Sequence, residues 1–193
     1  MIEYIKGTIT QITPTFVTIE SGGIGYFVNI SINTFSKLEG KIDFKIFIHE
    51  VIREDTHQLF GFADTSEREI FRLLISVSGV GANTARMMLS SLSPVEIEKA
   101  ILGSDVNLLK SVKGIGLKTA QRIIVDLKDK LGKHAGSGEI FAITDNTSRE
   151  EALSALVMLG FAKNAVSKVL DKIVREEKNL TVEDMIKRAL KNL

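Results

Sequence analysis

The chain has 193 residues, 44% of them hydrophobic, and a formal net charge of +1, which allows one or two domains with buried cores. It has no cysteine, which excludes disulfides, thiolate metal sites and a cysteine nucleophile. The first residues lack the basic start and apolar run of a signal peptide. No apolar stretch approaches the ~20 residues of a membrane span, so we expect a cytoplasmic protein.

Residues 1–63 are predicted to form a small β-barrel. Five short segments are rich in Ile, Val, Phe, Thr and Tyr, namely 2–12, 15–20, 25–31, 42–52 and 57–62. The segment 15–20 alternates apolar and polar residues, as a half-buried strand does. Five strands in about sixty residues favour a closed barrel of the oligonucleotide/oligosaccharide-binding (OB) type. Proteins with that fold have many functions, so the fold alone does not identify the function of this chain.

An acidic pair, Glu54-Asp55, falls between the last two predicted strands. The simplest interpretation is a solvated turn, because turns favour polar residues. In a DNA-binding protein, two carboxylates at a protruding tip would repel phosphates and keep strands apart. The histidines, His49, His57 and His134, are scattered without ligand spacing, so we expect no metal site and no cofactor.

Residues 64–133 are predicted to be helical. Phe71, Leu74 and Ile75 recur at helical spacing, and Ser93-Pro94 predicts a helix start with Ser93 as its cap. A last helix is expected over about 119–130. This segment has eleven Lys/Arg and eight Asp/Glu, whereas residues 1–63 have five and seven, and residues 134–193 have nine of each. The modest basic excess therefore falls on the helical segment.

One ten-residue sequence motif occurs twice in this segment, with the two copies thirty-five residues apart. Ser76-Val77-Ser78-Gly79-Val80-Gly81-Ala82-Asn83-Thr84-Ala85 returns as Ser111-Val112-Lys113-Gly114-Ile115-Gly116-Leu117-Lys118-Thr119-Ala120. Each copy follows one predicted helix and opens another. A single Gly-x-Gly is often an ordinary turn between helices. Two such turns have no packing reason to share Ser-Val and Thr-Ala as well, so the repeat indicates a duplicated function.

The repeat is typical of a phosphate-binding hairpin. Glycines two apart let backbone N–H groups approach a ligand, and the following helix starts with unpaired donors that suit a phosphate oxygen. Two copies could hold the two strands of a duplex without reading sequence. We predict as DNA-binding residues Ser78, Gly79, Gly81, Asn83, Arg86, Lys110, Lys113, Gly114, Gly116, Lys118, Thr119 and Arg122. Neither copy has the third glycine of a dinucleotide fingerprint, and no P-loop for ATP occurs.

A flexible linker is predicted over 134–147, where the sequence does not say what Phe141 and Ile143 contact. Residues 148–193 are predicted to form a compact three-helix unit. Ser148 and Glu151 would make a capping box for its first helix, which Gly160 would end as the C-cap. A second helix is expected over about 163–177, and Thr181 is expected to cap the third.

The corner Leu159-Gly160-Phe161 of this unit is predicted to recruit a partner. Leu159 and Phe161 could equally fill the core, because so small a unit needs every apolar side chain it has. The charges of the unit balance, so it is not an obvious DNA-binding module.

The order of barrel, twin glycine hairpins, linker and small helical unit resembles the RuvA family over essentially the whole chain. The stretches that carry the resemblance are Val51 to Phe62 with its Arg-Glu-Asp tip, Ser78 to Gly81, and Lys113 to Ala120 running into Lys128-Asp129-Lys130. The resemblance implies a multidomain α+β fold with an OB barrel, a tandem helix-hairpin-helix domain and a three-helix C-terminal domain similar to ubiquitin-associated domains.

The resemblance also implies a non-catalytic subunit that binds four-way (Holliday) junctions as a homotetramer and holds them open and square-planar; whether two tetramers pair into an octamer stays open. Glu54 and Asp55 would form acidic pins at the crossover, and the hairpins would hold the arms from the minor-groove side. The C-terminal domain, through Leu159, Gly160 and Phe161, would engage a RuvB-type hexameric ATPase. A RuvC-type resolvase is a further implied partner.

The first hairpin departs from a common form of the family pattern, which often has Pro-Lys where this chain has Ala82-Asn83. A cation is therefore missing there unless Arg86 replaces it. Two other functions remain open. A non-specific duplex-binding accessory subunit of a repair nuclease or ligase would explain the repeat but not the acidic tip. A protein-interaction adaptor would use the Leu159 corner and would show no salt-dependent DNA binding. An enzyme is least favoured, since no carboxylate cluster or triad spacing is present.

Overall fold

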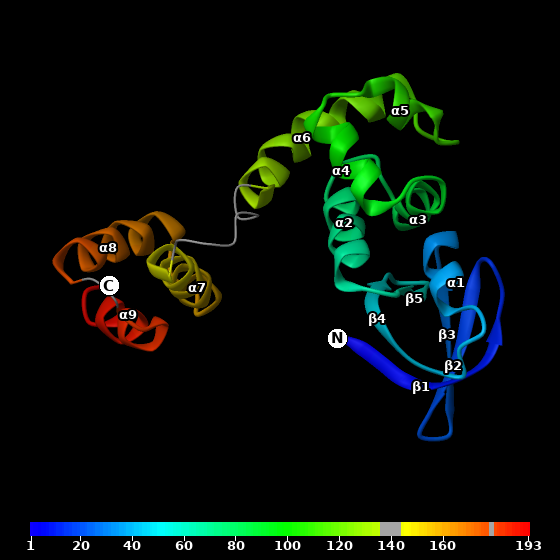
Figure 1. The fold of residues 1–193 in the computed structure, drawn as a ribbon, viewed down its shortest axis with the longest axis horizontal. Coiled ribbons are helices and arrows are strands. Elements are labelled where there is room, and N and C mark those ends of the chain that lie inside the picture. Colours follow the sequence, from blue (N-terminus) through cyan, green and yellow to red (C-terminus); the bar gives the residue numbers. More distant parts are fainter. Residues whose placement is uncertain (136–143, 178–179) are drawn as a thin grey trace. The chain divides into compact units, whose positions relative to one another are not determined.

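The computed structural model of the protein describes residues 1–135, 144–177 and 180–193. The chain divides into two compact units, residues 1–136 and 137–193. The first unit contains a β-barrel followed by helices, and the second contains three helices (Figure 1). The predicted α+β class, with an OB-type barrel, a hairpin region and C-terminal helices, is confirmed.

The barrel is closed by five strands in the order β1-β2-β3-β5-β4. The strands are β1 (Tyr4–Ile12), β2 (Phe16–Ser21), β3 (Ile24–Ile30), β4 (Asp43–Ile52) and β5 (His57–Phe62). Neighbouring strands are antiparallel except β3 and β5, which run parallel. The alternation predicted for β2 is confirmed, since Val17 and Ile19 are fully buried while Glu20 is exposed. Buried residues of β1 to β4 fill the barrel interior, and Leu59 of β5 packs against them.

A short helix in the barrel region, α1 (Ile32–Leu38), was not expected from the sequence. The hydroxyl of Ser31 caps it by accepting a hydrogen bond from the Thr34 backbone N–H, 3.0 Å away. Two of its own residues, Thr34 and Leu38, are buried. A seven-residue helix is marginal by propensity alone, so packing onto the barrel is what stabilises it.

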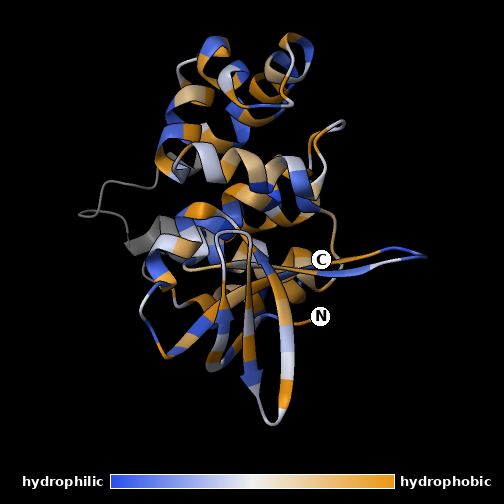
Figure 2. Ribbon diagram, turned by 90° about the vertical axis from the view of Figure 1, so that its right-hand side faces the viewer, coloured by the Kyte–Doolittle hydropathy of each residue, from blue (hydrophilic) through white to orange (hydrophobic). Residues whose placement is uncertain are grey.

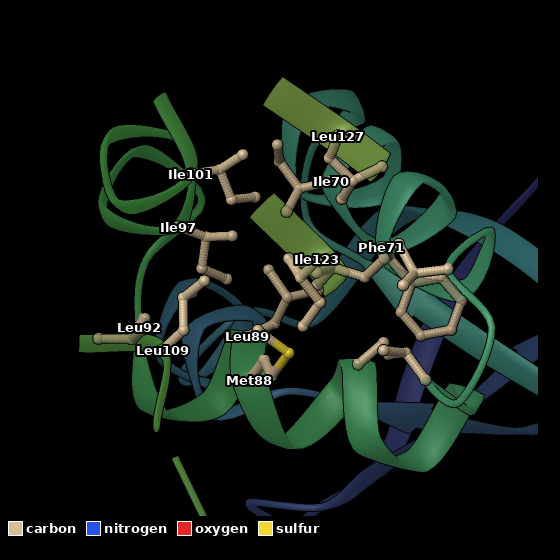
Figure 3. Close-up of a cluster of buried hydrophobic side chains, with 14 of the residues drawn as sticks. Ile70, Phe71, Met88, Leu89, Leu92, Ile97, Ile101, Leu109, Ile123 and Leu127 are labelled. Atoms are coloured by element: carbon tan, nitrogen blue, oxygen red, sulfur yellow. The ribbon is translucent and has the colours of Figure 1, made fainter. Parts of the chain in front are cut away.

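The helices α2 to α6 share one apolar core. They are α2 (Thr65–Ile75), α3 (Ala82–Ser91), α4 (Pro94–Leu102), α5 (Val106–Ser111) and α6 (Leu117–Ala135). Figure 3 shows side chains from these helices gathered around Met88, Leu89 and Ile123. The predicted start of α4 is confirmed, because Ser93 caps it in a capping box with Glu96 and Pro94 is its first residue. Helix α6 continues to Ala135, well past the predicted end near residue 130.

A buried polar and aromatic joint connects the barrel to α2. The Glu67 carboxylate, which has no exposed surface, accepts hydrogen bonds from the hydroxyls of Ser31 and Thr34. Burial raises the pKa of Glu67, although the two hydroxyl donors act in the opposite direction. The Phe71 ring packs against Phe60 of β5, with centroids 5.3 Å apart. The joint makes the barrel and the helices one unit.

The second unit consists of α7 (Thr144–Met158), α8 (Lys163–Glu176) and α9 (Val182–Leu190) around a small apolar core. Thr181 caps α9 as predicted, by accepting from the Asp184 N–H at 3.2 Å. The predicted capping box at Ser148 is wrong, because α7 begins at Thr144 and Ser148 lies inside it. In this longer helix Asp145 falls in the first turn, where an acidic residue suits the helix dipole.

Helices enter the predicted linker from both sides, α6 to residue 135 and α7 from residue 144. Phe141 and Ile143, whose contacts the sequence left open, lie outside the described residues. Within the part of the chain that the structure describes, no helix is long and apolar enough to cross a membrane.

Candidate nucleic-acid interface

The two glycine turns have the same internal geometry. In each, the residue between the glycines donates its N–H to the valine three residues earlier, Val80 to Val77 at 3.0 Å and Ile115 to Val112 at 3.1 Å. The serine that opens each copy also makes the same bond. The Ser76 hydroxyl donates to the Leu73 carbonyl at 2.7 Å, and Ser111 does so to Leu108 at the same distance. The sequence repeat is therefore a structural repeat.

The apolar residues of the repeat recur because they are buried. Val77, Val80 and Ala85 are buried in the first copy, and Val112, Ile115 and Ala120 in the second. These side chains belong to the shared core of α2 to α6. The core therefore fixes the backbone of both turns, while the residues between these positions face outward.

The glycines leave the outer face of each turn as open backbone. Gly79 and Gly114 have φ angles of 92° and 91°, which side chains other than glycine rarely adopt. Apart from the adjoining residues, no other atom lies within 4 Å of the position that a Cβ would occupy at Gly79 or Gly114, and the same holds for Gly81 and Gly116. Gly81 caps α3 without any side-chain hydrogen bond. The first N–H groups of α3 therefore remain available to an anion.

Cations surround the second turn. Lys110, Lys113 and Lys118 are exposed, as is Arg122, which pairs with Asp126 at 3.7 Å one turn further along α6. Because an exposed pair of this kind contributes little free energy, Arg122 can exchange Asp126 for a phosphate. Thr119 is partly buried at the start of α6, matching Thr84 of α3.

The first turn has a different environment. Ser78 and Asn83 are exposed, but the Arg86 guanidinium donates to the Thr15 carbonyl at 2.9 Å and to the Asn29 side chain at 3.4 Å. Burial lowers the pKa of Arg86 below its ordinary value without discharging it. Arg86 thus joins α3 to the barrel instead of facing solvent with the other predicted cations.

The predicted acidic pair lies at the end of the β4–β5 ribbon, which projects from the barrel and is hydrophilic at its tip (Figure 2). Glu54 and Asp55 are exposed there. The Arg53 N–H closes the loop by donating to the Thr56 carbonyl at 2.8 Å. Lower on the ribbon, Glu50 accepts from the Ile2 N–H at 2.7 Å, and that bond is the main reason its pKa is lowered.

A hollow of about 220 Å³ lies between the ribbon and the first glycine turn. From the ribbon it is lined by Val51, Arg53, Asp55, Thr56 and Gln58, and from the first turn by Gly81, Ala82, Asn83 and Thr84. The fold therefore brings the predicted acidic tip beside the first predicted DNA hairpin. Sequence reasoning did not assign a role to Arg53, and nothing local signals one, because the two sides of the hollow are almost thirty residues apart.

The predicted partner-binding corner of the second unit is exposed. Gly160 ends α7 with φ 98°, and the Phe161 N–H donates to the Leu156 carbonyl at 3.2 Å. Met158 is 87% exposed, Leu159 64% and Phe161 36%. Since Leu159 and Phe161 stay outside the buried core, the alternative that they fill it is wrong.

No group of three His, Asp or Glu side chains in the described ranges is placed to hold a metal ion. The geometry is that of a platform: open backbone on two matched turns, cations around the second turn, and carboxylates on a projecting ribbon. A closed OB-type barrel joined to such paired turns defines a tandem helix-hairpin-helix protein of the nucleic-acid-binding class.

Comparisons with known proteins narrow this class. Residues 1–61 match the family model of the RuvA N terminal domain, residues 71–129 the SAM-like helix-hairpin-helix tandem, and residues 147–193 the RuvA C-terminal domain. The chain belongs to the RuvA family, which confirms the resemblance seen in the sequence.

Three relatives named Holliday junction branch migration complex subunit RuvA illustrate the similarity. The protein of Christiangramia forsetii is 54% identical over 193 residues, and that of Flavobacterium psychrophilum is 50% identical over 193 residues. The protein of Bacteroides thetaiotaomicron is 51% identical over 201 residues. Each comparison covers 100% of both chains.

Proposed function

We propose that this protein binds four-way DNA junctions as a homotetramer, holds them open and square-planar, and recruits a RuvB-type hexameric ATPase for branch migration in recombination and repair. Full-length relatives that bear the name of a Holliday junction branch migration subunit support this function. On this proposal the protein makes and breaks no bond, needs no cofactor and acts in the cytoplasm.

The observation that carries the proposal is the placement of opposite charges on one compact unit. The two matched turns offer N–H groups, and the second adds Lys113 and Lys118, so both turns suit the phosphates of a duplex arm. Glu54 and Asp55 at the ribbon tip repel phosphates. Attraction along the arms with repulsion at the tip favours DNA whose strands part at the tip over an unbroken duplex.

The second unit supplies the attachment to the motor. Met158, Leu159 and Phe161 form an exposed apolar corner, and apolar groups of this size on a small polar unit indicate a protein partner. We assign this corner to the ATPase. A RuvC-type resolvase and the pairing of two tetramers into an octamer belong to the same proposal.

A gel-shift titration tests the function. A synthetic four-way junction is titrated with the protein at two salt concentrations, with excess linear duplex as competitor. We expect junction binding that survives the competitor and weakens as salt rises. Equal loss to duplex would refute junction recognition and favour a duplex-binding accessory subunit. Salt-independent failure to bind either DNA would favour the adaptor.

A further inference from the structure

The two turns differ in the charge that they carry themselves. The ten residues of the first copy, 76–85, include no lysine or arginine, whereas the second copy includes Lys113 and Lys118. Arg86 follows the first copy, but its guanidinium is hydrogen-bonded to Thr15 and Asn29 of the barrel. The first turn therefore has open backbone without a cation of its own.

A cation from another element faces the first turn. Arg53, at the outer end of the β4–β5 ribbon, lines the same hollow as Gly81, Ala82, Asn83 and Thr84. Its side chain is exposed, and no ion pair joins it to any residue within 1–135, 144–177 or 180–193. Its backbone N–H closes the loop with Thr56, which holds the start of the side chain in place.

We propose that Arg53 supplies the cation of the first turn and, together with the N–H groups at the start of α3, binds a DNA phosphate in this hollow. The inference rests on the proposed function and names the ligand of the hollow as a phosphodiester of the strand that passes the ribbon. Arginine suits the task because its planar fork can donate two hydrogen bonds to one phosphate.

The carboxylate of Asp55 limits how far along the ribbon a phosphate can bind. Asp55 lines the hollow too, so the charge along the ribbon changes from positive at Arg53 to negative at the tip. A phosphate is attracted beside the first turn and repelled one or two residues further out. The ribbon would therefore act as a guide that turns each strand at a fixed point before the crossover. Arg53 is a specificity-determining residue on this inference, because the exposed carboxylates at the tip repel an unbroken duplex that approaches the hollow.

The test compares Arg53→Gln and Arg53→Lys with a matched control. Lys6→Gln also removes one exposed cation from the barrel, but Lys6 lies opposite Lys45 in the strand register, and Lys45 is eight residues, or about 26 Å, from Arg53 along the ribbon. Each protein is titrated with a four-way junction and with a duplex of the same arm sequence over a range of salt concentrations. Thermal unfolding confirms that each variant is folded.

We expect Arg53→Gln to weaken junction binding about tenfold, since hydrogen bonds to charged groups contribute at least that factor. The slope of log affinity against log salt should become shallower by about 0.9 for each phosphate that the variant no longer neutralises. Duplex affinity should stay within about twofold of wild type. Arg53→Lys should fall between wild type and Arg53→Gln, because it keeps the charge without the fork, and Lys6→Gln should match wild type.

Three results would overturn the inference: wild-type junction affinity and salt slope in Arg53→Gln, an equal loss for junction and duplex, or the same loss in Lys6→Gln. The wild-type protein separates this failure from that of the proposed function. If the wild-type protein prefers junctions and Arg53→Gln has the same preference and affinity, only the role of Arg53 is refuted. If the wild-type protein shows no preference for junctions, junction recognition itself is refuted.

Discussion

The first and second glycine hairpins have the same backbone geometry but lie in different environments. Both turn at a glycine with φ near 90° and bury valine, valine or isoleucine, and alanine at matching positions. The first is joined to the barrel through Arg86 and faces the acidic ribbon, whereas the second is flanked by exposed lysines. The buried residues thus preserve the shape of a duplicated turn, while its exposed residues are free to give each copy a different task.

The largest expected effect concerns the joint that connects the barrel to α2, the helix leading into the first hairpin. Glu67→Ala leaves the buried hydroxyls of Ser31 and Thr34 without their acceptor and should lower the free energy of unfolding by about 3 kcal/mol. Chemical denaturation of the two proteins measures this. A loss below about 1 kcal/mol would show that the joint does not hold the first unit together.

The variant Glu67→Gln tests the same joint through pH. Because burial raises the folded pKa of Glu67 above its unfolded value of about 4.3, the stability from the neutral acid is fully present below that value. It is lost as pH rises through the folded pKa. Glutamine cannot ionise, so the stability of this variant relative to wild type should grow from about pH 4 towards neutral pH. A difference that is independent of pH would contradict the raised pKa.

The next effect tests whether the two turns are equivalent in backbone. Gly79→Ala and Gly114→Ala should each cost about 1 to 2 kcal/mol of unfolding free energy, because alanine is strained at φ near +90°. Gly81→Ala is the control, since Gly81 has φ −85° and open space around its Cβ position. Thermal or denaturant unfolding gives the values. Unequal costs at Gly79 and Gly114 would show that the hairpins differ in shape as well as in charge.

A further prediction compares the exposed residues of the two turns. Lys118→Ala should weaken junction binding by about tenfold and make its salt dependence shallower, because it removes one of the cations that surround the second turn. Asn83→Ala, at the matching position of the first turn, should change affinity less than about twofold. Binding titrations at several salt concentrations measure both. Equal losses would refute this ranking of the two positions.

The smallest expected effect concerns the ribbon. Glu54→Gln combined with Asp55→Asn should raise duplex affinity by about threefold and reduce the preference for junctions, because the repulsion that discriminates against duplex is removed. Glu20→Gln, an exposed barrel carboxylate, is the control. Competition between junction and duplex measures the ratio. Unchanged preference in the double variant would show that the carboxylates do not discriminate by charge.

The sequence predicted those elements whose pattern is long or repeated. The alternation in β2 and the helical spacing of Phe71 and Leu74 indicated the barrel and the helical region before any contact was known. The repeat located both turns, because a buried position tolerates few residues and so keeps its identity. The sequence pointed to the Leu159 corner, but it left open whether these side chains recruit a partner or fill the core. Only their exposure in the structure decides against the core.

Other features depend on contacts that no local pattern records. Helix α1 is too short for its periodicity to be recognised, and its cap at Ser31 is joined to Glu67, thirty-six residues away. Arg86 was expected to face DNA because it lies one turn beyond the hairpin, yet its acceptor Thr15 is seventy-one residues earlier. The hollow that places Arg53 beside the first turn arises in the same way. Folding alone brings these residues together.

The loop at the end of the ribbon imposes no backbone demand on its residues. In the described part of the chain, Ser104 is the one non-glycine residue with a positive φ, so none of positions 53–56 has the left-handed conformation that favours glycine. Mutation there can change side-chain chemistry without altering the fold. Substitutions at the tip of this protein can therefore alter the discrimination between DNA structures that we propose for it, while the rest of the molecule stays as it is.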